Sequence, residues 1–192
     1  MARIETSVQI AAPAEIVFAF FVPQRMPYWY GADMQACFEV QDGAPDFAVA
    51  QKVHIAGNLG KREVSHTAVV TALQQAQLFE WRFSDRYGVK GLERWQLERV
   101  DASSAQVAPK TIVRMVSDYT MPGFIGKIMD WLMTRHAVAR RNENYLARLT
   151  RYAEHAPEYR HDPRTKFPNS CFAISAWAAR RTPHREESHF LE

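Results

Sequence analysis

The stretch that decides the fold reads YTMPGFIGKIMDWLMTRHAVARRNENYLARLTRYAEH, residues 119–155. Pro122 and Gly123 end a run of strand-like sequence, and the spacing of apolar residues predicts a helix from about Phe124 to His155. At about 1.5 Å per residue this helix would be close to 50 Å long. Its apolar face consists of Phe124, Ile125, Ile128, Trp131, Leu132, Ala139, Leu146, Leu149 and Ala153. The face away from it carries Lys127, Arg141, Arg148 and Arg151, so the helix is amphipathic and must lie on an apolar partner.

The sequence before this helix predicts antiparallel strands. Residues 2–10 alternate between apolar and polar side chains, the pattern of a half-buried strand. Two short helical segments follow, one after Pro13 and one around Pro23 to Pro27. Further strands are predicted near 34–41, 48–56, 62–73, 78–85, 91–99 and 109–119, separated by turn residues. The links are too short for helical crossovers, so about seven strands should follow one another as hairpins.

The composition excludes several classes of protein. The chain has 192 residues, 47% hydrophobic and 23% charged, which is typical of one globular domain with a short appendage. A net charge of +3 is too small to indicate nucleic-acid binding. The apolar runs fall short of the roughly 20 residues of a spanning helix. The N-terminus lacks a secretory signal, so we expect a cytoplasmic protein. We also expect a monomer or weak dimer with no stable membrane insertion.

This layout resembles the START-like superfamily, also called SRPBCC, and within it the bacterial members of the polyketide cyclase/dehydrase type. The similarity lies in the order of elements and in three stretches: IETSVQIAAPAEIVF (4–18), GLERWQL (91–97) and YTMPGFIGK (119–127). The resemblance implies an α+β helix-grip fold, in which a curved antiparallel sheet of about seven strands wraps around the long C-terminal helix. It also implies a cavity between sheet and helix for apolar ligands such as lipids, polyketides and aromatic compounds.

The resemblance covers residues 1 to about 155, and we expect residues 1–156 to form one START-like helix-grip domain. Residues 157–192 depart from the family. They are interrupted by prolines and are nearly neutral in charge, so we expect a flexible tail. Within this tail, Cys171 to Arg181 favours a short apolar helix.

Motifs for several kinds of chemistry are missing from the sequence. There is no His-Glu-x-x-His, Cys-x-x-Cys or Gly-x-Ser-x-Gly, and no dinucleotide fingerprint. Residues 55–62 differ from a phosphate loop at both ends, with Ile55 and Arg62 in the wrong places, and a hairpin turn is the better interpretation. We therefore expect no metal site and no cofactor.

Two polar residues lie near the centre of the apolar helix face. Arg135 and Asn142 are seven residues apart and so share one side of the helix. Burying an unpaired arginine costs several kcal/mol. Arg135 is therefore predicted either to bind an acidic group of a ligand in the cavity, or to pair with a structural carboxylate or extend past the helix edge. Asn142 has the same alternatives. The remaining candidates for the helix side of the cavity are Ile128, Trp131 and Leu132.

Aromatic residues supply the other ligand-binding candidates. Trp81 and Trp95 lie on the apolar faces of neighbouring strands, where each would either stack on a flat ligand or pack in the core. Trp29 and Tyr30 follow the short helices, where the family has its cavity entrance. They would form either a gate or a hydrophobic clamp.

His54 and His66 are the catalytic candidates. They flank the turn at 57–60 almost symmetrically, so their side chains could approach one another as a general acid–base pair, or else lie partly exposed, as their neighbours Lys52 and Ser65 indicate. Arg114 would compete with Arg135 as the polar contact to a ligand if it faces inward, but alternation on its strand leaves its direction open.

These observations favour a binding protein that holds a small hydrophobic or aromatic ligand in an internal cavity. One alternative is an aromatase/cyclase-type enzyme acting on a polyketide-like chain, for which the sequence offers no convincing acid–base pair. The other is a protein-interaction module, similar to chaperone cofactors or toxin-like relatives, which would need an exposed apolar patch. The tail is the only candidate for that patch.

Overall fold

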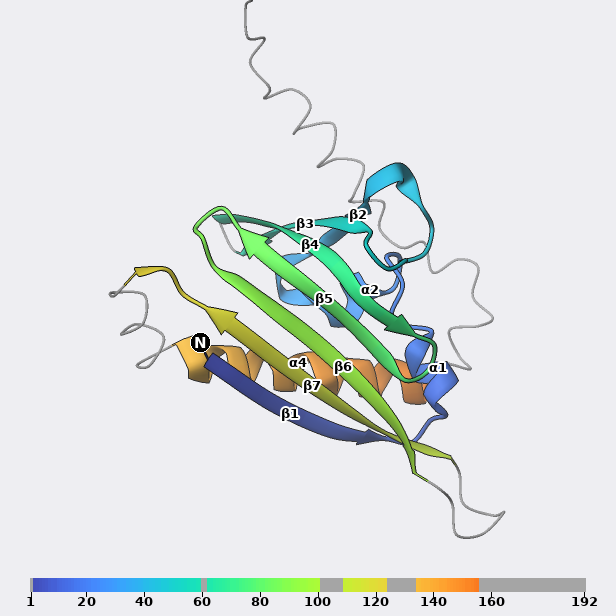
Figure 1. Cartoon of the computed structure of the whole chain (residues 1–192). Helices are drawn as coiled ribbons and strands as arrows, with labels where there is room; N and C mark the ends of the chain where they lie inside the picture. The colour runs from blue at the N-terminus through green and yellow to red at the C-terminus, as the bar shows by residue number, and fades with distance from the viewer. Residues whose placement is uncertain (1, 60–61, 101–108, 124–133, 156–192) are drawn as a thin grey trace, which may run out of the picture. The chain divides into compact units, whose positions relative to one another are not determined.

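The computed structural model describes residues 2–59, 62–100, 109–123 and 134–155. Within these residues, seven strands form one antiparallel sheet with the order β1-β7-β6-β5-β4-β3-β2 (Figure 1). The strands are β1 (Ala2–Ile10), β2 (Cys37–Val40), β3 (Lys52–Leu59), β4 (Arg62–Gln74), β5 (Leu78–Asp85), β6 (Lys90–Val100) and β7 (Lys110–Thr120). The predicted helix-grip class and its sheet of about seven strands are confirmed.

Consecutive strands from β2 to β7 pair as neighbours, as short links require, and β1 pairs with β7 at the far edge. The strand expected near 48–56 begins later, at Lys52, and continues to Leu59, and the strand expected near 34–41 is shorter than predicted. One reason is that Ala32–Met34 and Gln41–Gly43 form single 3₁₀ turns, η1 and η2. Left-handed backbone at Gly31 (φ 74°) and Gln35 (φ 50°) brackets η1 and redirects the chain into β2.

The side chains of each strand point alternately to the two faces of the sheet. The inner face is apolar and includes Ile55, Val70, Phe79, Trp81, Trp95, Leu97, Val113 and Met115, all buried. The outer face carries cross-strand ion pairs between Arg3 and Asp118 (3.6 Å) and between Arg114 and Glu5 (3.2 Å). The sheet therefore has one face for the core and one for solvent.

Helix α4 (Arg135–Glu154) lies on the inner face and packs most closely against β1 (Figure 1). Its buried residues are Asn142, Tyr145, Leu146, Leu149 and Ala153, which recur at helical spacing. The predicted first part of this helix, residues 124–133, lies outside the described residues. No helix in the described part of the chain is long and apolar enough to cross a membrane.

Two short helices, α1 (Ala14–Phe18) and α2 (Met26–Trp29), follow β1 as predicted. The indole Nε1 of Trp29 donates a hydrogen bond to the Phe20 carbonyl oxygen at 3.0 Å, which fixes one helix against the other. The Met34 carbonyl comes so close to Gly57 of β3 that a Cβ there would lie 2.6 Å from it. Only glycine permits this approach of η1 to the sheet. The predicted tail, 157–192, and its helix at 171–181 lie outside the described residues.

Candidate functional site

A cavity of about 280 Å³ lies between the inner face of the sheet and α4. Its walls come from β4, β5, β6 and β7, from α4, and from the segment that follows α2. It is lined by Tyr30, Met34, Val64, His66, Phe83, Asp85, Val89, Glu93, Ser117, Tyr119, Met121, Thr134, Val138, Arg141 and Tyr145. Apolar walls with a few polar groups are the usual composition of a small-molecule site.

The carboxylate of Glu93 is the centre of a buried hydrogen-bond network in the cavity wall. Glu93 is only 1% exposed. Its Oε2 accepts hydrogen bonds from the Tyr30 hydroxyl at 2.6 Å and from Trp81 Nε1 at 3.1 Å. Its Oε1 accepts one from Arg141 Nη2 at 2.8 Å. A buried carboxylate of this kind is tolerated because it is both paired and hydrogen-bonded.

Arg141 reaches this network from α4 and also contacts the ring of Tyr145, whose centroid lies 5.5 Å from the guanidinium carbon. Burial opposes the charge of Arg141, but the Glu93 carboxylate more than offsets burial, so the pKa of the guanidinium is raised. The Arg141 side chain is still 38% exposed, although its Nε is buried without a hydrogen-bond partner among the described residues.

The phenol groups around Glu93 remain protonated. Burial, and then the negative charge of Glu93, raise the pKa of Tyr30 well above its usual range. Burial raises the pKa of Tyr145 to about 12, with Arg141 opposing and Glu93 adding to the shift. Both hydroxyls are therefore neutral hydrogen-bonding groups at physiological pH.

Asn142 is fully buried and joins α4 to β7. Its side-chain Nδ2 donates a hydrogen bond to Ser117 Oγ at 2.9 Å. Asn142 is not among the described lining residues, whereas Ser117 is. The contact orients the helix beside the cavity, so the structural alternative for Asn142 has the better support.

The predicted approach of His54 and His66 is wrong. In the register of β3 and β4, His54 lies opposite Thr67 and His66 lies opposite Ile55. Because side chains alternate along a strand, this one-residue offset places the two imidazoles on opposite faces of the sheet. His66 faces inward and lines the cavity, while His54 is exposed on the outer face.

Burial lowers the pKa of His66 below its ordinary value of 6.5, and Arg141 adds to this effect while Glu93 and Asp85 oppose it. The unfolded chain therefore takes up a proton at this residue before the folded protein does. We expect stability to fall as the pH drops below about 6.5, by at most about 1.4 kcal/mol per pH unit from this residue. Denaturant unfolding at two pH values measures the fall.

The matched variants are His66→Gln and His54→Gln. His66→Gln should reduce the loss of stability between neutral and mildly acidic pH, whereas His54→Gln should keep it, since His54 is exposed on the outer face of the sheet. An equal loss of stability in all three proteins would contradict the assignment.

Of the two alternatives predicted for Arg135, the one without a ligand contact has the better support. Arg135 is exposed in the first turn of α4 and does not line the cavity in the described structure. Arg135 shares a helix face with the buried Asn142, but it lies two turns closer to the helix start, and periodicity does not say how far the sheet covers a helix. Arg141, expected on the far face, flanks the buried stripe instead and spans the distance with its long side chain.

Glu93 and Arg141 were not predicted as site residues, although the strand pattern around Glu93 contains a signal. Glu93 has the same parity as Trp95 and Leu97 on β6, so strict alternation places its carboxylate on the apolar face. An acidic residue there needs a buried partner. No comparable signal identifies Arg141, because the sequence around it is typical of a solvent-exposed helix face.

The aromatic candidates fall into two groups. Tyr30 lines the cavity, and its hydroxyl is held by Glu93. Trp29, Trp81 and Trp95 are fully buried in an aromatic cluster and are not among the described lining residues. For Trp81 and Trp95 the core alternative therefore has the better support. Trp29 and Tyr30 are buried as well, and their rings contact one another, which favours the clamp over the gate.

Arg114 faces outward, where it pairs with Glu5, so it does not compete for the ligand. Ile128, Trp131 and Leu132 lie outside the described residues. Among the described residues there is no group of three His, Cys, Asp or Glu side chains arranged to hold a metal ion.

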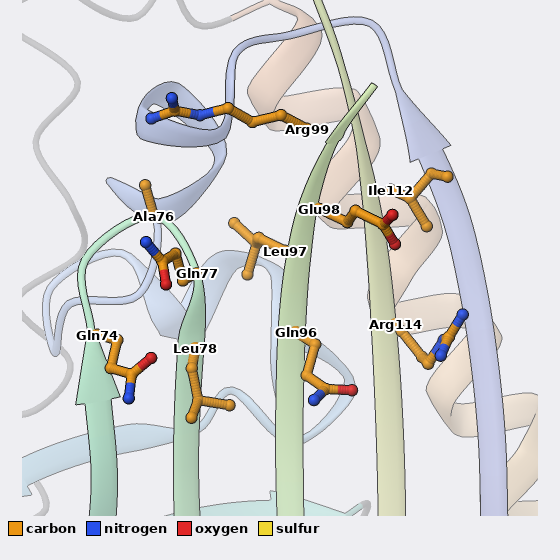
Figure 2. A pocket seen from close by; sticks show the side chains of 10 residues that line it. All are labelled: Gln74, Ala76, Gln77, Leu78, Gln96, Leu97, Glu98, Arg99, Ile112 and Arg114. Atoms are coloured by element: carbon orange, nitrogen blue, oxygen red, sulfur yellow. The ribbon is translucent and has the colours of Figure 1, made fainter. Parts of the chain in front are cut away.

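A larger hollow, about 660 Å³, lies at the end of the β4–β5 hairpin (Figure 2). Figure 2 shows that its side chains come from neighbouring strands, among them Gln96, Glu98 and Arg114, which occupy outward positions. Arg99, at its rim, is paired with Glu15. This hollow has a mostly polar lining and open access to solvent, so the smaller cavity is the better candidate for an apolar ligand.

Solved structures with the same fold share little sequence with this chain. Protein CV1439 from Chromobacterium violaceum is 13% identical with a TM-score of 0.57, covering 80% of this chain and 99% of its own. Protein jhp0584 from Helicobacter pylori is 11% identical with a TM-score of 0.60, covering 79% and 88%. DynU16, from the dynemicin biosynthetic locus, is 16% identical with a TM-score of 0.53; the match covers 79% of this chain and 47% of DynU16.

No curated protein is significantly similar to this chain in sequence. The model of one protein family, described as polyketide cyclase / dehydrase and lipid transport, matches residues 1–154. This match covers all the described strands and the whole of α4, which together build most of the cavity wall. The chain therefore belongs to the polyketide cyclase / dehydrase and lipid transport family, of the SRPBCC type, with the ligand-binding fold of that group.

Proposed function

We propose that the protein binds one compact, mainly apolar ligand in the cavity between the sheet and α4. The observation that carries the proposal is the cavity itself, with apolar side chains on both layers and a hydrogen-bonded polar network in its wall. Its volume of about 280 Å³ lies near the lower end of ligand pockets, which span about 300–1,000 Å³. A ligand of one or two rings suits this size better than a long lipid chain.

Burial of apolar surface supplies most of the binding free energy, at about 25 cal/mol per Å². Arg141, Tyr145 and Ser117 then supply polar contacts that orient the ligand. The described residues lack the pair of histidines that would favour an enzyme, because His54 and His66 lie on opposite faces. Binding is therefore the function that the site supports best.

Filling the cavity tests this proposal. Val138 lines the cavity from α4, so Val138→Trp places a large ring in the ligand's space and should weaken binding of a compact aromatic probe, 2-acetonaphthone, at least about tenfold. Calorimetric titration of the purified protein gives the affinity.

The control is Ala147→Trp, which adds the same ring to an exposed position of the same helix. It should bind the probe as the wild-type protein does, and circular dichroism should show both variants folded. If Val138→Trp binds the probe unchanged, the ligand site lies elsewhere in the protein.

A further inference from the structure

The charged side chains that line the described part of the cavity have no net positive charge that could attract an anionic ligand. Asp85 and Glu93 contribute two carboxylates, and Arg141 contributes one guanidinium. We propose that the cavity selects uncharged ligands that carry a hydrogen-bond-accepting oxygen, such as aromatic ketones, and excludes carboxylates of the same shape. This inference rests on the proposed function, since it names the class of ligand that the same cavity takes.

The charge of Arg141 is already neutralised inside the protein. Its Nη2 donates to Glu93 at 2.8 Å, and Glu93 is fixed in place by Tyr30 and Trp81. Glu93 is 1% exposed, so it cannot turn out to solvent and release Arg141. A ligand carboxylate would therefore sit beside an existing ion pair and bring an uncompensated negative charge into a largely apolar space.

Asp85 adds a second negative charge on the same side of the sheet. Its Oδ1 accepts hydrogen bonds from the backbone N–H groups of Tyr87 at 2.8 Å and Val89 at 2.9 Å, which hold the carboxylate in one orientation. His66 lies directly opposite Asp85 in the pairing of β4 with β5. Burial keeps the pKa of His66 low, so near neutral pH its imidazole does not offset the charge of Asp85.

An uncharged oxygen meets different conditions at the same place. The Arg141 guanidinium carries five N–H donors, so it can donate a hydrogen bond to a ligand while Nη2 remains on Glu93. A ketone oxygen accepts that bond and brings no net charge, so its desolvation costs far less than that of a carboxylate. The neutral hydroxyl of Tyr145 adds a second donor in the lining.

The test compares two probes of the same ring system and similar size, 2-acetonaphthone and 2-naphthoate. At about pH 7.5 only the second is charged. We expect the wild-type protein to bind the ketone at least about tenfold more tightly than the carboxylate, a difference of about 1.4 kcal/mol. Calorimetric titration at two salt concentrations measures both affinities and shows whether charge causes the difference.

Two variants locate the cause of the selectivity. Asp85→Asn removes one negative charge and keeps a side-chain oxygen for the Tyr87 and Val89 amides, and Glu93→Gln leaves Arg141 without its counter-ion. Each should shift the ratio of the two affinities towards the carboxylate by about tenfold. Asp118→Asn makes the same change of net charge on the outer face, beside Arg3, and should leave the ratio unchanged.

Thermal unfolding of each variant shows that it is folded, and Asp85→Asn carries the test if Glu93→Gln does not fold. Equal affinity for the two probes, or tighter binding of the carboxylate, in the wild-type protein overturns the selectivity and leaves the proposed function standing. A shift with Asp118→Asn as large as with Asp85→Asn also overturns it. If neither probe binds, both the selectivity and the proposed function are overturned.

Discussion

Glu93→Ala should lower the free energy of unfolding by about 3–5 kcal/mol. The substitution leaves the buried Tyr30 hydroxyl and the Trp81 indole N–H without their acceptor, and it removes the counter-ion of Arg141. Each buried donor left unpaired costs about 1–3 kcal/mol. Arg141 is 38% exposed and regains some hydration, which limits its share of the loss. Denaturant unfolding followed by circular dichroism measures the change.

The control for Glu93 is Glu5→Ala, which breaks the pair with Arg114 on the outer face. Both partners of that pair are about half exposed, at 47% and 50%. Exposed ion pairs contribute about 0–1 kcal/mol, so this variant should be close to the wild type. Equal effects of the two substitutions would show that the network around Glu93 does not stabilise the fold.

Trp95→Ala is the second substitution with a large expected effect, about 3–5 kcal/mol. Trp95 has no exposed surface, and its ring contacts those of Phe21, Trp29, Tyr30, Phe79 and Trp81, all within about 6 Å between centroids. These neighbours come from β5, from α2 and from the residues beside the two short helices. No single element can therefore move to fill the space that alanine leaves. The exposed Tyr87 provides the control, and Tyr87→Ala should change stability by no more than about 0.5 kcal/mol.

Phenylalanine variants separate packing from hydrogen bonding in the same cluster. The indole N–H of Trp81 donates to Glu93, while that of Trp95 is buried and has no partner among the described residues. Trp81→Phe should therefore cost about 1.5–3 kcal/mol more than Trp95→Phe, the usual contribution of a hydrogen bond to a charged group. Equal losses would mean that the indole of Trp81 acts by packing alone.

Glu93 links stability to ligand choice in this protein. The same carboxylate that anchors Tyr30 and Trp81 also cancels the charge of Arg141 at the cavity wall. Replacing it should therefore reduce stability and widen the range of ligands at the same time. Asp85→Asn affects only the second property to a large degree, because the substitution keeps the acceptor for both backbone amides.

The arrangement of elements was predictable from local patterns. Alternation over residues 2–10 predicts β1 with its observed limits, and the turn residues between later segments predict a sheet of hairpins. The apolar spacing of the C-terminal helix predicts the face that carries Leu146, Leu149 and Ala153, all of which are buried. These features depend on interactions between residues close in the chain, and such interactions leave a periodic signal.

The site depended on distances that no local pattern records. His54 and His66 differ from the predicted arrangement by a one-residue shift in hairpin register, which is enough to put them on opposite faces. Whether Arg135 or Arg141 reaches the cavity depends on how far along α4 the sheet extends. Sequence periodicity describes only the angle of a residue around the helix. Arg114 has apolar neighbours on both faces of β7, so only the pairing with Glu5 shows that it points outward.

The sequence by itself therefore determined the fold class, the order of its elements and the face of the last helix that is buried, because periodicity and turn chemistry act within short segments. Only the tertiary structure decided that Glu93 of β6, Arg141 of α4 and Tyr30 of the segment after α2 meet in one network. These residues are separated by 48 and 63 positions in the chain. Their meeting depends on sheet register and helix placement, which the whole core sets together.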